Sequence, residues 1–225
     1  MTHFQSRSIL DKELTKMRED VLRLTSMVDT AIEKAMSALD TRDVALAQEV
    51  IAGDDEINVL RFDIEKEALR TLATQQPAAT DLRMTVVGVH LAIELERIGD
   101  HASGIASLVS RMEEEDDIAS LHKLPKMANR ARKMIQQGIQ AFVNNDAEMA
   151  RAVFQRDEKI DKHYKNLIQI LLEAMQEDSY IRRATFLSWI GHNLERIGDR
   201  ATNIAERVIF MATGEFVEFL DDMDS

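Results

Sequence analysis

A six-residue motif that occurs twice places the strongest constraint on how this chain can fold. Leu-Glu-Arg-Ile-Gly-Asp, the LERIGD motif, stands at residues 95–100 and again at 194–199, an offset of 99 positions. The match extends outward, and 10 of the 19 positions in 91–109 are identical to those in 190–208. Self-similarity of this kind is typical of a duplicated unit, so the second half is expected to repeat the fold of the first.

Apolar residues recur at alternating steps of three and four, as from Leu10 to Leu39, which is the period of a helix with one buried face. Only two prolines and eight glycines are present, which favours a few long elements. We therefore predict an all-α fold of six long helices, arranged as two tandem, pseudo-symmetric three-helix bundles with antiparallel neighbours. The helices are expected at about 10–40, 44–74, 81–112, 125–144, 147–177 and 181–213.

Five consecutive acidic residues, Glu113 to Asp117, separate the two halves. Like charges packed this densely disfavour a helix, so an exposed connector is expected here. The predicted organisation is a first repeat at 1–112, an acidic linker at 113–121 and a second repeat at 122–225. The acidic tail at 215–225 is expected to be frayed.

Several residues are suited to starting or ending a helix. Asp43 is a candidate N-cap for the second helix, and Pro77 ends that helix because the residue before a proline is pushed out of helical geometry. Residues 145–148, Asn-Asp-Ala-Glu, have the form of a capping box for the fifth helix, with the Asn as the cap. Asp178 and Ser179 are candidate caps for the sixth.

The composition narrows the possible partners. Asp and Glu number 40 against 28 Lys and Arg, a formal net charge of −12. Such a surface repels a phosphate backbone, so nucleic-acid binding is not expected, whereas metal ions are favoured. The absence of cysteine excludes disulfides and thiolate metal sites and fits a reducing cytoplasm. We recognise neither a signal peptide nor a membrane span, so a cytoplasmic protein without direct membrane insertion is expected.

Each LERIGD motif carries two carboxylates four residues apart, which places them one turn apart on one helix face, off the apolar seam. Because such carboxylates repel each other, a cation is expected beside them. The antiparallel neighbour of each motif helix offers further oxygen ligands, so two exterior acidic grooves are predicted. The candidate ligands are Asp54, Asn58, Glu96 and Asp100 in the first repeat, and Asp157, Asp161, Glu195 and Asp199 in the second, where Asn203 is a further candidate.

Carboxylate oxygens suit hard cations such as Mg²⁺, Ca²⁺, Mn²⁺ or oxidised iron. A plainer interpretation stays open, because Arg97 and Arg196 stand beside the acids and Glu–Arg pairs on helix surfaces are routine. Gly99 and Gly198 stand between the acids, and a glycine inside a helix costs about 1 kcal/mol relative to alanine. They indicate close approach by another helix or by a ligand, and close helix packing is the preferred explanation.

The usual enzyme motifs are missing from the chain. It contains no H-E-x-x-H, no G-x-S-x-G and no phosphate-cradling G-x-x-x-x-G-K-S/T. No histidine follows a Glu at the Glu-x-x-His spacing of di-iron helical bundles. We therefore do not expect an enzyme, and we expect His101 and His163 on helix surfaces, with His192 and Trp189 helping to pack the sixth helix.

At the two LERIGD motifs the sequence resembles the PhoU family of bacterial phosphate-uptake regulators. The resemblance covers essentially the whole chain, including the twofold repeat, the acidic segments 53–58 and 157–161, and the stretches 76–83 and 199–204. It implies two three-helix bundles with pseudo-twofold symmetry in a cytoplasmic protein that often forms homodimers. It also implies a negative regulator that links the ATPase subunit of the phosphate ABC transporter to a membrane sensor histidine kinase.

The resemblance further implies metal sites. Some family members bind multinuclear iron or other metal clusters through paired E(D)-x-x-x-D motifs, which makes iron the first candidate, followed by manganese, magnesium, zinc and calcium. The pair Asp54 and Asn58 departs from this pattern, which leaves the first site one carboxylate short. The implied ligand pairs that keep the pattern are Glu96/Asp100, Glu195/Asp199 and Asp157/Asp161.

Three interpretations of the function remain open from the sequence. The first is a non-enzymatic signalling adaptor that represses the phosphate-starvation response. The second is a carboxylate-based metal-binding or storage protein without a role in phosphate signalling. The third is a helical scaffold whose acidic stripes are only solvated.

Overall fold

Six long helices make up the chain in a computed structural model, which describes residues 2–112 and 123–217. No strand occurs in these ranges, so the all-α prediction is confirmed. The predicted acidic linker and the end of the tail lie outside the described residues. None of the described helices has an apolar stretch of the length that a bilayer crossing needs. In chain order the elements are α1 (Thr2–Thr41), α2 (Val44–Gln75), α3 (Ala79–Arg111), α4 (Lys123–Asn144), α5 (Ala147–Ala174), the 3₁₀ turn η1 (Asp178–Tyr180) and α6 (Ile181–Thr213).

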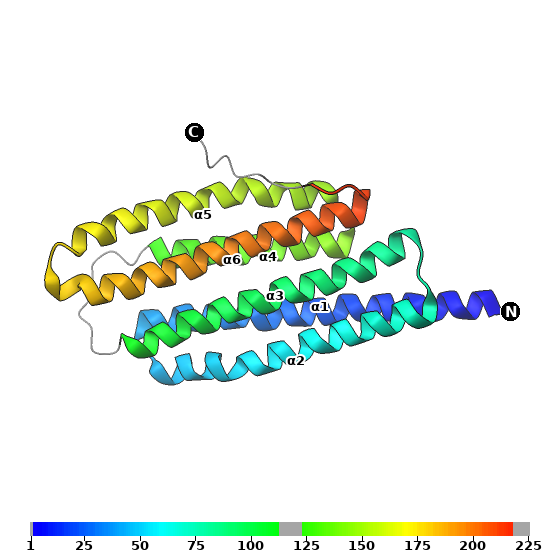
Figure 1. The fold of residues 1–225 in the computed structure, drawn as a ribbon, viewed down its shortest axis with the longest axis horizontal. Coiled ribbons are helices and arrows are strands. Elements are labelled where there is room, and N and C mark those ends of the chain that lie inside the picture. Colours follow the sequence, from blue (N-terminus) through cyan, green and yellow to red (C-terminus); the bar gives the residue numbers. More distant parts are fainter. Residues whose placement is uncertain (1, 113–122, 218–225) are drawn as a thin grey trace.

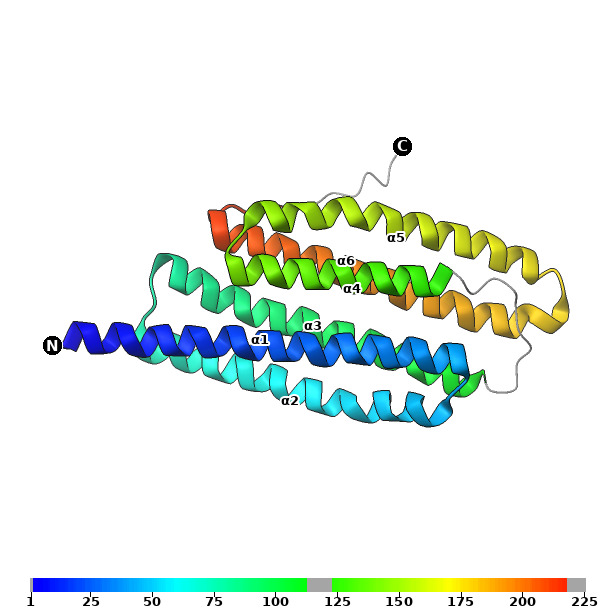
Figure 2. The ribbon, with the colours of Figure 1, turned by 180° about the vertical axis from the view of Figure 1, so that it is seen from behind.

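The helices form two three-helix bundles that lie side by side, with α1, α2 and α3 in one and α4, α5 and α6 in the other (Figure 1). Helices α3 and α6 run antiparallel along the contact between the bundles, and α1 also meets α4 (Figure 2). The second bundle repeats the helix order of the first. The arrangement is the pseudo-symmetric pair of bundles that the repeated motif predicts.

The LERIGD helices contribute fully buried residues to the core. Leu95 and Ile98 of α3, and Leu194 and Ile197 of α6, have no exposed surface. Burying a side chain of this kind stabilises a fold by about 1.5–3 kcal/mol. Because α3 and α6 pack both within their own bundles and against each other, the buried residues form one hydrophobic cluster that spans both repeats.

A polar contact fixes the spacing of α1 and α4. Arg132 on α4 donates to both carboxylate oxygens of Asp29 on α1, at 2.7 and 2.8 Å, and to Glu33 at 3.1 Å. The guanidinium fork matches the geometry of a carboxylate, which makes this a directional link. It holds the bundles together at a second place, beside the α3–α6 contact.

The start and end of α2 are as predicted. Asp43 accepts a hydrogen bond from the backbone N–H of Leu46 at 2.9 Å and so caps the helix. At the other end α2 stops at Gln75, and Gln76 adopts a left-handed conformation, with φ of 47°, directly before Pro77.

The predicted caps of α5 and α6 are wrong in detail. The N-cap of α5 is Asp146, which accepts from the backbone N–H of Met149 at 2.9 Å. Asn145 instead takes a left-handed conformation, with φ of 53°, which asparagine tolerates better than most residues. Asp178 and Ser179 lie in the 3₁₀ turn, and α6 begins after it without a side-chain cap.

Candidate metal centres

The glycine of each LERIGD motif lies where the motif helix crosses its neighbour. A Cβ atom on Gly99 would stand 3.5 Å from the Asp54 carboxylate of α2, and one on Gly198 would stand 3.1 Å from the Asp157 carboxylate of α5. In both repeats the isoleucine three residues after that aspartate would lie 3.1 Å away. Close helix packing therefore accounts for both glycines, and the alignment of α2 with α5 holds in space.

The first groove brings together the acids of α2 and α3. Burial raises the pKa of Asp54, and the negative charge of Asp100 raises it further. Burial also raises the pKa of Glu96, with the Asp100 charge as the next cause. The Arg61 guanidinium, 3.9 Å from Glu96, acts in the opposite direction. Three carboxylates thus repel one another across two helices, and two protein cations, Arg61 and Arg97, offset part of that repulsion.

Asn58 offsets a different part of the repulsion. Its amide nitrogen lies 3.3 Å from both the Oδ2 atom and the backbone oxygen of Asp54. The Oδ1 atom of Asp54 is buried and has no hydrogen-bond partner in the described part of the chain. A buried polar atom left in this way costs about 1–3 kcal/mol, which a cation bound at the groove would offset.

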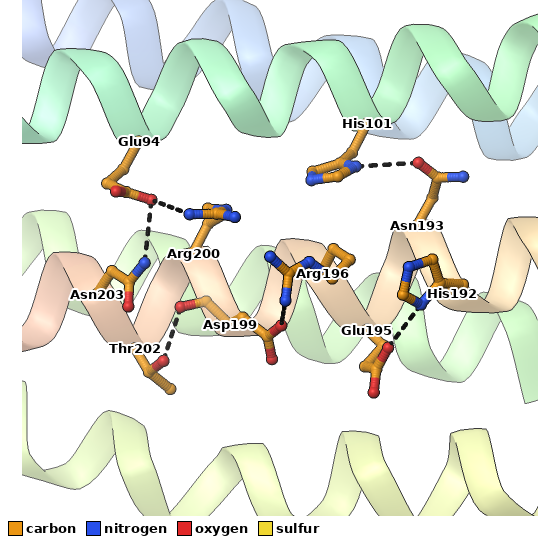
Figure 3. A network of polar contacts seen from close by, with 10 residues as sticks. All are labelled: Glu94, His101, His192, Asn193, Glu195, Arg196, Asp199, Arg200, Thr202 and Asn203. Atoms are coloured by element: carbon orange, nitrogen blue, oxygen red, sulfur yellow. Dashed lines mark hydrogen bonds and ion pairs between the residues drawn. The ribbon is translucent and has the colours of Figure 1, made fainter. Parts of the chain in front are cut away.

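The second groove contains four carboxylates, and the most deeply placed is Asp157, whose exposed fraction is 7%. On α6, the Nδ1 atom of His192 lies 2.9 Å from Glu195, and Arg196 donates to Asp199 at 2.8 Å (Figure 3). The acids of this groove are thus also in contact with protein groups that carry or can take a positive charge.

Tyr164 on α5 stands at the position that Arg61 occupies in the first repeat, when α2 and α5 are aligned. Burial raises the pKa of Tyr164, and the Glu195 charge raises it further. The phenol and the imidazole of His192 are neighbours, with ring centroids 6.3 Å apart. The spacing of the acids alone does not predict a role for Tyr164, although aligning the two repeats pairs it with Arg61.

Each groove brings acids of two neighbouring helices near one another. The acids of α2 and α3 face each other, and so do those of α5 and α6. Within the described ranges, however, no three Asp, Glu or His side chains converge on a point as a ligand set would. A metal ion would therefore have to replace protein contacts such as those of Arg61, Arg196 and His192.

A separate set of polar contacts, the α3–α6 seam, joins the two motif helices (Figure 3). Glu94 lies 3.4 Å from Arg200 and 3.3 Å from Asn203. Farther along, the Nδ1 atom of His101 lies 3.0 Å from the Oδ1 atom of Asn193. Glu94 and His101 correspond to Asn193 and Arg200 at the offset of 99, so pseudo-symmetry relates the two contacts.

The seam corrects two predictions. Asn203 donates to Glu94 on the other motif helix, which removes it from the candidate ligands of the second groove. His101 is not a surface residue, because it is half-buried between the bundles, and this burial lowers its pKa. The Nδ2 atom of Asn193 donates to a backbone oxygen at 2.8 Å, so its Oδ1 atom accepts from the Nδ1–H of His101.

Three further aromatic positions can be compared with expectation. His192 is exposed; it contacts Glu195 and its ring lies beside that of Tyr164 on α5, so its part in packing α6 is at the surface. Trp189 is 45% exposed, yet its ring makes an edge contact with Phe186 at 5.8 Å between centroids. His163 is half-buried on α5.

The fold and the paired grooves define a class of protein: a duplicated three-helix architecture with an acidic groove on each motif helix. The family model described as "PhoU domain" matches the chain twice, at residues 21–109 and 124–208. The chain therefore belongs to the PhoU family, and the resemblance seen in the sequence is confirmed.

Relatives of this family match over nearly their whole length. The chain is 34% identical to a Clostridium acetobutylicum protein over 96% of this chain and 100% of that protein, and 36% identical to a Pseudomonas aeruginosa protein over 98% and 91%. Both carry the name "Phosphate-specific transport system accessory protein PhoU homolog".

Solved structures give the same result. A crystal structure of PhoU from Pseudomonas aeruginosa superposes with a TM-score of 0.86 at 36% identity, covering 91% of this chain and 99% of that one. The phosphate transport system regulatory protein PhoU from Streptococcus pneumoniae gives 0.88 at 32% identity, with 93% and 100% covered.

Proposed function

We propose that this protein is an accessory regulator of phosphate-specific transport that represses the phosphate-starvation response when phosphate is ample. The observation that carries this proposal is similarity over nearly the full length to proteins named for that transport system. The protein would act in the cytoplasm as a non-enzymatic adaptor, and as a homodimer, between the transporter ATPase subunit and a sensor histidine kinase. Its two repeats offer related surfaces with different charges, which suits a protein that meets two partners.

Metal ions at the two grooves belong to the same proposal. Carboxylate oxygens from two helices fit a hard cation, with iron as the first candidate and manganese, magnesium, zinc or calcium as alternatives. Asp54, Asn58, Glu96 and Asp100 would hold it in the first groove, and Asp157, Asp161, Glu195 and Asp199 in the second. A bound cation would neutralise the like charges and link each motif helix to its neighbour, and the buried Oδ1 atom of Asp54 supports this fit.

The regulatory proposal is tested by deleting the gene and measuring a phosphate-starvation reporter in high phosphate. We expect the reporter to switch on in the deletion strain and to be repressed again when the gene is restored. Co-purification of the tagged protein with the transporter ATPase subunit then tests the adaptor role. A reporter that stays off in the deletion strain would refute the regulatory role.

A second candidate function, metal storage, is favoured by the four carboxylates of the second groove. It predicts reversible loading and release of metal, together with an unchanged phosphate-starvation reporter in the deletion strain. The same strain therefore separates the two functions, because only the regulator predicts a response to phosphate.

A further inference from the structure

A hollow of about 460 Å³ lies where α2, α3 and α6 approach one another, beside the first groove. Three guanidinium groups from three different helices line it, together with two carboxylates and one imidazole. Positive groups thus outnumber carboxylates here, although the chain as a whole has a net charge of −12. The groups concerned are Arg61 of α2, Glu96, Arg97, Asp100 and His101 of α3, and Arg200 of α6.

The arginines have hydrogen-bond donors that the protein leaves unused. The Nε atoms of Arg61 and Arg200 are buried, and neither has a hydrogen-bond partner among the described residues. Arg61 donates from Nη1 to Glu65 at 2.9 Å, so this part of its fork is already used. Its contact with Glu96 is longer, at 3.9 Å, as is that of Arg200 with Glu94, at 3.4 Å. Because guanidinium forks match the spacing of phosphate or carboxylate oxygens, this lining suits an oxyanion.

The two carboxylates determine which oxyanion fits. Glu96 and Asp100 offer acceptors only, and a fully ionised sulfate would bring its negative charge against them without a proton between. Hydrogen phosphate keeps an O–H at neutral pH and can donate it to a carboxylate while its other oxygens accept from the arginines. A site built to hydrogen-bond a ligand's O–H strongly rejects an analogue that lacks it.

The second repeat does not reproduce this lining. The position of Arg61 is taken by Tyr164, and that of Ile93, which also faces the hollow, by His192. Arg196, the counterpart of Arg97, is hydrogen-bonded to Asp199 at 2.8 Å. The guanidinium cluster therefore adjoins only the first groove, with Arg61 and Arg97 from the first repeat and Arg200 from the second.

We propose that this hollow binds inorganic hydrogen phosphate, with Arg61, Arg97 and Arg200 donating to its oxygens and Glu96 or Asp100 accepting its O–H. Binding would make the state of the protein depend directly on the phosphate concentration. This regulatory role of binding rests on the proposed function, whereas the binding itself does not. No metal is required, and a cation on Glu96 and Asp100 would compete with the ligand.

Isothermal titration calorimetry of the full chain, treated with a chelator, tests the proposal at pH 7.5. We expect phosphate to bind, and sulfate to bind at least about tenfold more weakly, because the carboxylates lose their donor. AMP serves as the nucleotide arm, since its phosphate has the same chemistry. Absence of phosphate binding, equal binding of sulfate, or tighter binding of AMP would each overturn the assignment to inorganic phosphate.

Two kinds of variant test the residues. Arg97→Gln, at an exposed position, is expected to weaken phosphate binding about tenfold, since it removes a charged hydrogen-bond donor. Arg151→Gln removes the same charge on α5, a helix that contributes no residue to the lining of the hollow, and is expected to leave binding unchanged. Equal effects of these two variants would reduce the site to non-specific charge attraction and overturn the proposal.

The double variant Glu96→Gln/Asp100→Asn tests the acceptors. Its affinities for phosphate and sulfate should differ by no more than about threefold, because neutral amides no longer repel sulfate. Retained preference for phosphate would show that these carboxylates do not select the ligand. If phosphate does not bind in the titration, the reporter result still stands, and the binding proposal alone is refuted. If the reporter stays off in the deletion strain, the titration result still stands, and the regulatory proposal alone is refuted.

Discussion

The two acidic grooves share one backbone frame and differ in how their charge is offset. In both, an aspartate oxygen of the neighbouring helix lies within 3.5 Å of the Cβ position of the motif glycine. In the first groove, Asn58 stands four residues after that aspartate and Arg61 lies beside Glu96. In the second, the same positions hold Asp161 and Tyr164. The first groove therefore has one carboxylate fewer and Arg61 beside Glu96, whereas the second offsets its acids through Arg196 and His192.

This difference teaches which features of a duplicated site are constrained by packing. The glycine contact lies in the core, where added volume is costly, and both repeats keep it. The positions at which the repeats differ, 58 and 61 against 161 and 164, are partly exposed, and there water screens charge and substitution costs less. The second groove has one more carboxylate ligand to offer a cation, whereas the first adjoins the arginine-lined hollow.

The largest expected effect on stability comes from substituting the motif glycines, which disrupts the close helix packing that the two grooves share. Gly198→Leu forces side-chain atoms against Asp157 and Ile160, and Gly99→Leu does so against Asp54 and Ile57. Each substitution is expected to lower the free energy of unfolding by about 3 kcal/mol, measured by urea denaturation.

Gly53→Ala serves as the control for these glycine variants, because a Cβ atom there meets nothing within 4 Å. It is expected to stabilise the helix by about 1 kcal/mol. If only one of the two motif glycines proved sensitive, the grooves would not share a frame.

The next effect concerns metal content. Glu195→Gln/Asp199→Asn is expected to abolish metal binding at the second groove, since two of four carboxylate ligands are lost. The matched variant Glu96→Gln/Asp100→Asn should remove only the smaller and more weakly bound part of the metal, which is held by the first groove. Elemental analysis of protein purified without chelator or metal-affinity chromatography measures both. No metal in the unmodified protein, even after reconstitution with iron, manganese or magnesium, would reject the metal proposal.

Exchanging an amide for a carboxylate at the position where the two grooves differ tests the effect of the carboxylate count. Asn58→Asp gives the first groove a fourth carboxylate and is expected to raise its metal affinity about tenfold, which corresponds to about 1.4 kcal/mol. Without metal the same variant should lose about 0.5 kcal/mol of stability, since it places like charges four residues apart. Asp161→Asn in the second groove should have the opposite effects. Calorimetric titration with Mn²⁺ follows the affinity, and unchanged affinity in both variants would remove the charge count as the cause.

The smallest effect is the pH dependence of stability. The pKa values of Asp54 and Glu96 are raised above 3.8 and 4.5, so the folded protein holds these protons more tightly than the unfolded chain. Their contribution to stability is fully present below about pH 4 and is lost as the pH rises through the raised values. Glu96→Gln should therefore raise stability at pH 7 by less than about 1 kcal/mol, because the side chain is only half-buried.

Urea midpoints at pH 4 and pH 7 test this pH dependence. Glu195→Gln is the matched control in the second groove, where the carboxylate contacts His192 at 2.9 Å. The control is expected to show no such gain at pH 7, because it loses that contact. An equal gain in both variants would contradict the difference between the grooves.

The sequence alone determined the helices, the duplication and which acids of each motif share one helix face. A helical period and a repeated motif are local properties, so they place Glu96 and Asp100 on one face whatever the rest of the chain does. Antiparallel packing of short-linked helices then brings Asp54 and Asp157 opposite the motif glycines. These features depend on spacing along the chain, and spacing is visible in the sequence.

Only the tertiary structure decided which groups neutralise those acids and what lies between the repeats. Each motif helix packs against the helices of its own bundle and against the other motif helix. How far each helix is rotated about its axis decides which residues face which neighbour, and that rotation depends on packing across the whole core. That rotation places Asn203 against Glu94 rather than in the second groove, and buries His101 beside Asn193. It also gathers arginines from three helices around one hollow, because contacts so distant in sequence follow from the packed core and not from local periodicity.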